Sequence, residues 1–334
     1  MTLLFQGNYQ NRRMKILVCP LNWGLGHAAR CVPIIRQLIS EGNEVVIAAD
    51  GLPHQFLQLE FPELRFLEAP TQNIRYSTGN SQIWAMLKSV PRIFYNIFQD
   101  HDWLRRLLKQ EQFDRVISDN RFGCWNKKVF SIYITHQLMV KMPPVLKFME
   151  PVIWRLHRFF IHHYDECWIP DLEGDENFSG DLSHRYPLPD NAHFIGILSR
   201  FQPLQNIIPN FDYETVIVLS GPEPQRSIFE KQMTEKFSID TAKSLMIQGL
   251  PQQKQTTTQI GNLTKVSHLP TQEMVSFLKG AKKIIARSGY STIMDLQTLD
   301  CLSKAILVPT PGQTEQIYLA ELHKKRRNIE NLQV

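Results

Sequence analysis

A histidine in a glycine-containing loop is the first feature of this chain that could move a proton. The stretch Gly24-Leu25-Gly26-His27 follows an apolar run, Lys15–Pro20, that is typical of a buried strand. Glycines let the backbone turn tightly near a ligand, and an imidazole titrates near neutral pH. His27 is therefore a candidate general base for an attacking hydroxyl, with helix capping as the plain structural alternative.

Two further polar residues stand at the ends of apolar segments that favour β-strands. Asp119 ends the run Arg115–Asp119, and His136 follows the run Ser131–Thr135. Open α/β sheets bind ligands at the carboxyl ends of their strands. Asp119 and His136 are therefore also catalytic candidates, although a polar residue at a strand end often serves only a turn.

A different chemistry is indicated near the C-terminus, where Ser288-Gly289 leads an apolar strand into a helix. The start of a helix has unpaired N–H groups and a partial positive charge, which suit a phosphate. Asp295, further along that helix, can accept hydrogen bonds from sugar hydroxyls. This combination predicts a site for a nucleotide diphosphate and favours a nucleotide-sugar.

A second loop, Ser220-Gly221, follows the predicted strand Thr215–Leu219 and is placed to approach the same phosphates. The prolines at 222 and 224 lack backbone donors, so we expect Arg226 to supply positive charge. The alternative is a rigid turn between strand and helix.

Together, Arg287-Ser288-Gly289, Asp295 and the segment Pro311–Gln316 resemble the donor region of GT-B glycosyltransferases. The closest likeness is to the group containing the N-acetylglucosaminyltransferase of peptidoglycan lipid-intermediate synthesis. The resemblance implies that the diphosphate faces Ser288 and Gly289, and that Asp295, often Glu in that group, holds the ribose. It also implies a sugar contact for Gln316 and no metal. The donor residues implied are Ser220, Gly221, Arg226, Arg287, Ser288, Gly289, Asp295, Gln313, Glu315 and Gln316.

The first loop carries its own resemblance and leaves the reaction open. As Gly-x-Gly-His, with Gly24 and Gly26, it is similar to the acceptor-side loop of GT-B transferases. With Arg30 it also resembles Gly-x-Gly-His-x-x-Arg of a GT-B nucleotide-sugar hydrolase, where this pattern carries the general base. It is a poor dinucleotide fingerprint because Ala29 takes the third glycine position. An inverting glycosyltransferase is the favoured interpretation, with a uridine nucleotide as donor; a hydrolase, a 2-epimerase and a non-catalytic nucleotide-sugar-binding protein remain alternatives.

Strand and helix patterns alternate along both halves of the chain, which predicts parallel, doubly wound sheets. The expected α/β architecture is GT-B, with two Rossmann-like domains facing a central cleft. Residues 1–13 are set aside as an extension, 14–200 form the acceptor domain, 201–212 a linker and 213–334 the donor domain. The C-terminal crossing helix of GT-B enzymes is expected to be short or missing. Helices interrupted near Pro91 and Pro151, and a polar loop over Gln252–Gln259, complete the prediction.

Composition limits the function classes. The chain has 334 residues, 43% of them hydrophobic, and a net charge of +5. Its five scattered cysteines contain no CxxC pair, which favours reduced thiols in the cytoplasm and argues against a zinc site. No run approaches a membrane span, and no dense basic-aromatic patch suggests nucleic acid. No separate cofactor is expected, since the nucleotide-sugar is a substrate.

Two segments combine apolar, aromatic and basic residues, Trp84–Lys109 and Val145–Phe160. Such interleaving is typical of helices lying in a membrane interface, and also of core helices with a basic outer face. The first interpretation predicts peripheral contact with an anionic membrane, at the cytoplasmic face in cell-envelope synthesis. The acceptor would then be lipid-linked; a soluble sugar is the alternative.

Overall fold

The protein is described by a computed structural model covering residues 12–71, 82–250 and 254–330, with side chains outside 82–90 and 329–330. The chain folds into two compact units. The first takes the residues up to Trp23 and His27–Leu198, and the second takes Gly24–Gly26 and the residues from Ser199 onward.

The first unit is built on a seven-stranded sheet whose neighbouring strands are all parallel, in the order β3-β2-β1-β4-β5-β6-β7. The central strands are almost fully buried, as expected where helices cover both faces. The strands are β1 (Lys15–Pro20), β2 (Glu44–Ala49), β3 (Arg65–Glu68), β4 (Arg115–Asp119), β5 (Phe130–Ile134), β6 (Glu166–Ile169) and β7 (Ala192–Phe194).

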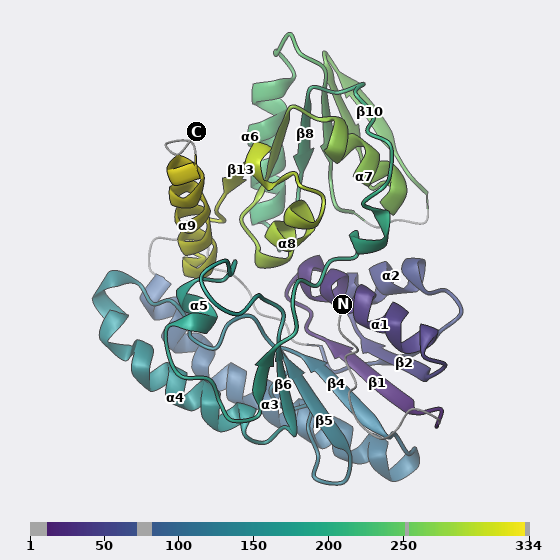
Figure 1. Ribbon diagram of the computed structural model, residues 1–334, viewed down its shortest axis with the longest axis vertical. Coiled ribbons are helices and arrows are strands. Elements are labelled where there is room, and N and C mark those ends of the chain that lie inside the picture. Colours follow the sequence, from purple (N-terminus) through teal and green to yellow (C-terminus); the bar gives the residue numbers. More distant parts are fainter. Residues whose placement is uncertain (1–11, 72–81, 251–253, 331–334) are drawn as a thin grey trace. The chain divides into compact units, whose positions relative to one another are not determined.

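Helices lie against both faces of this sheet (Figure 1). On one face, Leu104 packs against Leu17 and Val46 of the sheet. The helices are α1 (Leu25–Ser40), α2 (Gly51–Glu60), α3 (Gln82–Gln110), the 3₁₀ helix η1 (Pro144–Met149), α4 (Glu150–Ile161) and α5 (Asp181–His184).

The second unit has a six-stranded sheet in the order β10-β11-β9-β8-β12-β13, in which only the β10–β11 pair is antiparallel. Its strands are β8 (Thr215–Val218), β9 (Ser244–Ile247), β10 (Thr257–Ile260), β11 (Leu263–Val266), β12 (Lys283–Arg287) and β13 (Ala305–Val308). Its helices are η2 (Gln202–Leu204), α6 (Gln225–Phe237), α7 (Thr271–Gly280), α8 (Tyr290–Thr298), η3 (Leu302–Lys304) and α9 (Thr314–Glu330).

The predicted fold class, two Rossmann-like α/β domains with parallel sheets, is confirmed. Three local predictions were wrong. Helix α3 runs through Pro91 without ending, since a proline removes only one backbone hydrogen bond of a long helix. The break predicted at Pro151 falls one residue earlier, because Pro151 occupies the first turn of α4, where proline is tolerated. The predicted polar loop contains β10, which pairs with β11 at the sheet edge.

Within the described residues, no helix is both long enough and apolar enough to cross a membrane.

Candidate functional site

The first candidate site lies where the strand order of the first sheet reverses. β1 has β2 on one side and β4 on the other, and Pro20 pairs with Asp119 at the carboxyl ends of β1 and β4. A doubly wound sheet binds its ligands at such a switch point. The loop after β1 leads into α1, and the first turn of that helix carries His27. The sheet therefore brings His27 and Asp119 together from distant parts of the sequence.

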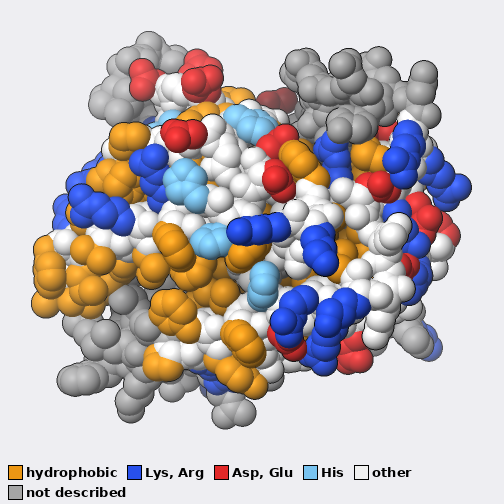
Figure 2. Space-filling view, turned by 90° about the horizontal axis from the view of Figure 1, so that it is seen from below, with side chains coloured by type: hydrophobic (Ala, Val, Ile, Leu, Met, Phe, Trp, Pro, Cys, Tyr) orange, Lys and Arg blue, Asp and Glu red, His pale blue; other side chains and the backbone are white. Residues whose placement is uncertain are grey.

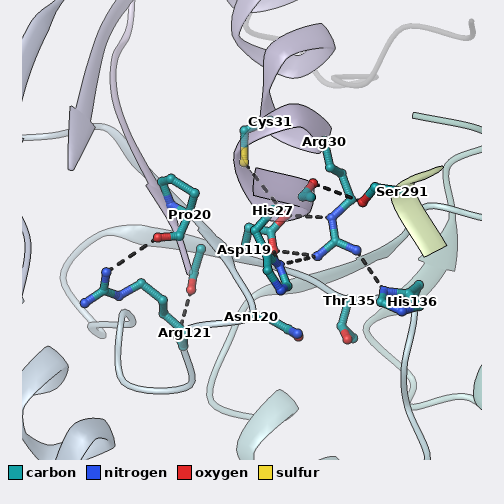
Figure 3. Close-up of polar contacts among 12 residues, drawn as sticks. Pro20, His27, Arg30, Cys31, Asp119, Asn120, Arg121, Thr135, His136 and Ser291 are labelled. Atoms are coloured by element: carbon teal, nitrogen blue, oxygen red, sulfur yellow. Dashed lines mark hydrogen bonds and ion pairs between the residues drawn. The ribbon is translucent and has the colours of Figure 1, made fainter. Parts of the chain in front are cut away.

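Asp119 is the centre of a buried polar network shown in Figure 3. Its Oδ1 lies 2.6 Å from Nδ1 of His27 and accepts a 2.5 Å hydrogen bond from Nη2 of Arg30. Its Oδ2 accepts a 2.7 Å bond from Nε of Arg30. Arg30 therefore grips the carboxylate with two donors, the geometry that fixes a carboxylate most firmly. The Cys31 thiol lies behind, 3.8 Å from Oδ2.

The charge state of Asp119 follows from its surroundings. Burial raises the pKa of this carboxyl, but the charge of Arg30 and the contact with His27 outweigh burial and hold the pKa well below its usual range. Asp119 is therefore ionised at neutral pH and can only accept hydrogen bonds.

This assigns the proton on His27. Because the carboxylate at 2.6 Å is an acceptor, Nδ1 must carry the hydrogen, and the lone pair of the neutral ring lies on Nε2. Nη2 of Arg30 then donates its hydrogen bond to Asp119. It lies 3.1 Å from Nδ1 of His27 as a close contact only, because both nitrogens carry hydrogen. The His27 side chain remains 17% exposed while the Asp119 side chain is 0% exposed, so within this pair the ring of His27 is the part accessible to a ligand.

His136 joins the network from the loop after β5. Its Nδ1 lies 2.8 Å from Nη1 of Arg30. Arginine cannot accept a hydrogen bond, so this nitrogen of His136 is the acceptor and the ring is neutral there. The structure thus gives the catalytic candidate His136 a contact with Arg30, the residue that also holds Asp119. Of the loop glycines, Gly24 has a φ of 126°, which favours glycine, and Gly26 lies in the first turn of α1.

Arg30 is the member of this network that the sequence prediction left out of the site. It stood within the quoted pattern, three positions after His27, and residues at this spacing share one face of a helix. A second buried pair, Arg121 with Asp100 at 2.6 Å, was also missed. Because Asp100 lies on α3 and Arg121 follows β4, this pair joins α3 to the loop after β4. Arg121 also donates a hydrogen bond to the carbonyl of Pro70.

The second candidate site is the switch point of the other sheet, where β8 has β9 on one side and β12 on the other. The loops after β8, β12 and β13 leave this edge of the sheet beside one another. Ser220 and Gly221 follow β8, and Gly221 has a φ of 102° with open space where a side chain would begin. Gly289 caps α8 without a side-chain hydrogen bond, so that helix start keeps backbone donors for a ligand.

Arg287, at the end of β12, forms hydrogen bonds with the segments that follow β8 and β13. Its Nη1 donates to the carbonyl of Pro309 at 2.9 Å and its Nη2 to the carbonyl of Gln225 at 3.2 Å. The guanidinium carbon lies 3.9 Å from the centre of the Phe229 ring. Burial lowers the pKa of Arg287 to about 10, which leaves it charged at neutral pH. Arg287, predicted to contact the donor, is placed here as a support for the loops.

Arg226 is also engaged elsewhere. Nε donates to Glu223 at 2.6 Å and Nη1 to Glu230 at 2.9 Å. Glu230 also pairs with Lys265 at 2.6 Å, so Arg226 belongs to a cluster of two acids and two bases, and its expected contact with the donor phosphates stays a prediction. The side chain anchors the start of α6 to the residues around it.

Asp295 lies in α8 with Oδ1 accepting a 2.5 Å hydrogen bond from the Ser199 hydroxyl. Burial raises the pKa of Asp295 to about 6, against the opposing effects of the Arg200 charge and of this hydrogen bond. The carboxyl thus titrates close to the neutral range.

The loop after β13 is fixed by its own glutamines. Ser288 Oγ donates to the carbonyl of Gln316 at 2.8 Å, and Gln316 Oε1 accepts from the Thr310 backbone at 2.9 Å. Gln316 Nε2 donates to Gln313 Oε1 at 2.6 Å. Gln313 and Gln316 therefore meet at the end of β13, and Glu315 lies between them in the first turn of α9.

The predicted interfacial segments fall on α3, η1 and α4. Trp84 and Lys88, which belong to that prediction, lie outside the residues whose side chains are described. Further along, these elements expose large apolar side chains, namely Phe94, Phe98, Val145, Phe148, Val152 and Phe159, here called the apolar face. Figure 2 shows hydrophobic side chains gathered on the side where α4 lies in Figure 1.

No metal-binding group of three or more His, Cys, Asp or Glu side chains occurs among the described residues.

Comparison with known proteins places the chain by fold. No protein-family model matches the sequence. A curated protein of Methanosarcina acetivorans described as an uncharacterized glycosyltransferase is 23% identical over 251 residues. That match spans 68% of this chain and 60% of the relative, so the chain covers less than two thirds of the relative's length.

Solved structures give the fold likeness more broadly. The glycotransferase of kitacinnamycin superposes with a TM-score of 0.56 at 14% identity, covering 93% of this chain and 84% of that one. A glycosyltransferase of Streptomyces sp. complexed with thymidine diphosphate gives 0.55 at 12% identity, over 93% and 86% of the two chains. The calicheamicin glycosyltransferase gives 0.54 at 10% identity, over 95% and 90%. At these identities the likeness establishes the GT-B fold.

Proposed function

We propose that this protein is a glycosyltransferase that moves a sugar from a nucleotide-diphosphate sugar to an acceptor hydroxyl, with inversion at the sugar carbon. The observation that carries the proposal is the pair formed by His27 and Asp119, with Nδ1 at 2.6 Å from the buried carboxylate and the His27 side chain partly exposed. The glycosyltransferase name of the archaeal relative and the fold likeness support it.

In the proposed reaction, Nε2 of His27 takes the proton of the acceptor hydroxyl as its oxygen attacks the anomeric carbon. The new C–O bond forms while the bond from that carbon to the diphosphate breaks, and the diphosphate leaves with the electron pair. Attack from the face opposite the diphosphate inverts the carbon. Asp119 keeps the ring in the productive tautomer and stabilises the imidazolium that forms, without taking the proton itself.

The donor belongs, in this proposal, to the second unit. The start of α8 at Gly289 and the Ser220-Gly221 loop would stabilise the departing diphosphate with backbone donors. Asp295 would accept hydrogen bonds from the ribose, and Gln313, Glu315 and Gln316 would border the sugar. This assignment needs neither a metal nor a further cofactor. A uridine nucleotide is favoured by the resemblance of the donor motifs to the peptidoglycan-type transferases, although one structural neighbour binds thymidine diphosphate.

The acceptor is proposed to be presented by a membrane, as in cell-envelope synthesis at the inner face of the cytoplasmic membrane. The apolar face supports this, because large exposed apolar side chains mark interaction surfaces. Arg92, Lys147 and Arg155 are exposed on the same elements and complement an anionic surface. Each such charge contributes about 1 kcal/mol near anionic lipid.

Sedimentation with vesicles tests this contact. We expect binding to anionic vesicles that weakens as salt rises, since exposed charges are screened. Arg155→Gln, which removes one of these positive charges, should bind more weakly than the unmodified protein. Equal recovery in the supernatant with and without anionic vesicles would remove the membrane from the proposal.

The transferase proposal is tested by incubating the protein with a panel of nucleotide-sugars and measuring released diphosphate, with and without acceptor alcohols. Release that depends on an acceptor, and that His27→Ala abolishes, is expected. Release at the same rate without acceptor would identify a nucleotide-sugar hydrolase using the same residues. No release with any donor that binds would support a non-catalytic nucleotide-sugar-binding protein.

A further inference from the structure

A cavity of about 340 Å³ lies in the first unit, apart from the residues assigned above. Its walls come from the loops after β1, β4 and β5 and from helices α3 and α4. Most of the wall is apolar or aromatic, with Phe94, Ile97, Phe122, Ile153, Leu156 and Phe160 among the lining residues. This size falls within the range of small-molecule sites, about 300–1,000 Å³.

The cavity reaches the same edge of the sheet as the polar network. Asn120, which lines it, directly follows Asp119, and Figure 3 shows Asn120 beside the network. Gln137, also in the lining, follows His136, and Trp23 lies in the connection that leads to His27. A molecule in this cavity would thus meet the residues adjoining the proposed base.

The described residues of the lining carry no charge near neutral pH. None of the described residues that line the cavity is Lys, Arg, Asp or Glu. The one histidine among them, His157, donates a hydrogen bond from Nδ1 to the Leu138 carbonyl at 3.3 Å. Burial lowers the pKa of His157 to about 4, so its ring is neutral. An anionic group would lose its hydration here without gaining a counter-charge, which is costly.

Two polar groups in the wall have no partner within the described residues, Nδ2 of Asn96 and Nε1 of Trp23. Asn96 is buried, at 6% exposure, and its Nδ2 makes no hydrogen bond within the described part of the chain. Buried amides are normally paired, so an unpaired donor lining a cavity fits an oxygen atom of a ligand. In the same wall, Oδ1 of Asn120 accepts a 3.0 Å hydrogen bond from the Tyr133 hydroxyl.

The cavity also opens outward through apolar side chains. Phe94 and Leu156 line it while remaining 48% and 43% exposed. Phe94 belongs to the apolar face as well, so the entrance is continuous with that surface. A lipophilic molecule can therefore enter without crossing a polar rim.

We propose that this cavity binds the acceptor, and that the acceptor is an uncharged, largely apolar hydroxyl compound, such as a phenol or a fused-ring alcohol. This rests on the proposed function, because it assigns the hydroxyl to His27. The Asn96 amide holds a second oxygen of the acceptor. A diphosphate-linked sugar does not fit the uncharged wall, so a lipid acceptor of this protein is neutral in the part that the cavity encloses.

The test measures binding alone, without any donor. Methylumbelliferone, a fluorescent fused-ring phenol, is titrated at slightly acidic pH, where it is neutral, and methylumbelliferyl phosphate serves as the anionic probe. We expect the phenol to bind at least tenfold more tightly than the phosphate. Leu156→Glu, which brings a charge to the lining, should weaken phenol binding at least tenfold.

Val152→Glu is the matched control, because Val152 lies one turn before Leu156 on α4, is 58% exposed and does not line the cavity. It should bind the phenol as the unmodified protein does. Equal binding of the two probes, or an unchanged affinity in Leu156→Glu, would overturn the proposal. Phenol binding without any sugar transfer would support the cavity as a binding site and refute the transferase function. Sugar transfer by a fully active Leu156→Glu variant would support the transferase function and refute the cavity as the acceptor site.

Discussion

The two sheets reverse their strand order at equivalent points, yet the residues gathered there differ in kind. In the first unit, Arg30 is buried and donates hydrogen bonds to Asp119. This ion pair holds the carboxylate that orients His27. In the second unit, Arg226 and Arg287 are buried and form hydrogen bonds with neighbouring protein groups. The loops there present glycine and the start of helix α8. Proton transfer needs one side chain held in one tautomer, whereas a diphosphate can be bound by backbone donors.

This contrast predicts that damage at the two points is felt in different measurements. Changes in the first unit should lower turnover, and changes in the second should lower donor affinity. Four substitutions or conditions test the contrast, beginning with the largest effect.

His27→Ala should lower kcat by about 100-fold or more, because it removes the group that takes the acceptor proton. Initial rates at saturating donor and acceptor measure this. His193→Ala is the matched control, since His193 is an exposed histidine on β7. Near-normal turnover by a folded His27→Ala protein would transfer the role of base to another residue.

Asp119→Asn should lower both turnover and stability, because it leaves Arg30 buried without a counter-charge. Removing one partner of a buried pair costs about 3–5 kcal/mol. Thermal unfolding with kcat on the same samples measures the two effects. Asp102→Asn is the comparison, since its partners Arg105 and Arg106 are largely exposed and such pairs contribute about 1 kcal/mol or less. Equal losses of stability in the two variants would argue against a buried, constrained network.

Asp295→Ala should weaken binding of uridine diphosphate by roughly tenfold or more, from the loss of a charged hydrogen bond of about 1.5–3 kcal/mol. Calorimetric titration provides the measurement. Ser199→Ala separates the two roles of this carboxyl, because it removes only the internal partner of Asp295. If Asp295→Ala binds the diphosphate with unchanged affinity, Asp295 is a structural residue of α8.

Donor affinity should also fall as the solution is acidified. With the pKa of Asp295 near 6, the carboxyl is ionised above this pH and protonated below it, so hydrogen-bond acceptance weakens as pH drops. The ionised fraction decreases about tenfold between roughly pH 7 and 5. The Asp295→Asn variant is titrated across the same pH range as the control. Its side chain does not ionise, so the pH dependence of its affinity reports the protonation of the ligand itself. A pH profile identical in this variant and the unmodified protein would exclude the carboxyl as the cause.

The sequence predicted the frame of both sites better than their contents. Strands β1 and β4 have the predicted bounds, because buried apolar runs are local properties of the sequence. The partners of Arg226 were also local, since Glu223 and Glu230 stand three and four positions away and face the same side of a helix. That spacing was available and was not used.

Other features required the folded chain. His27 and Asp119 are 92 positions apart, and only the pairing of β1 with β4 makes them neighbours. The burial of Arg287 depends on Phe229 and on loops from two other strands. The cavity draws its wall from several separate segments, so no single pattern in the sequence could indicate it.

The most direct measurement of the division between the two units is the affinity of His27→Ala for uridine diphosphate, with Asp295→Ala titrated beside it. We expect His27→Ala to bind within about twofold of the unmodified protein, while Asp295→Ala loses roughly tenfold or more. A loss in His27→Ala as large as that in Asp295→Ala would contradict separate roles for the two switch points.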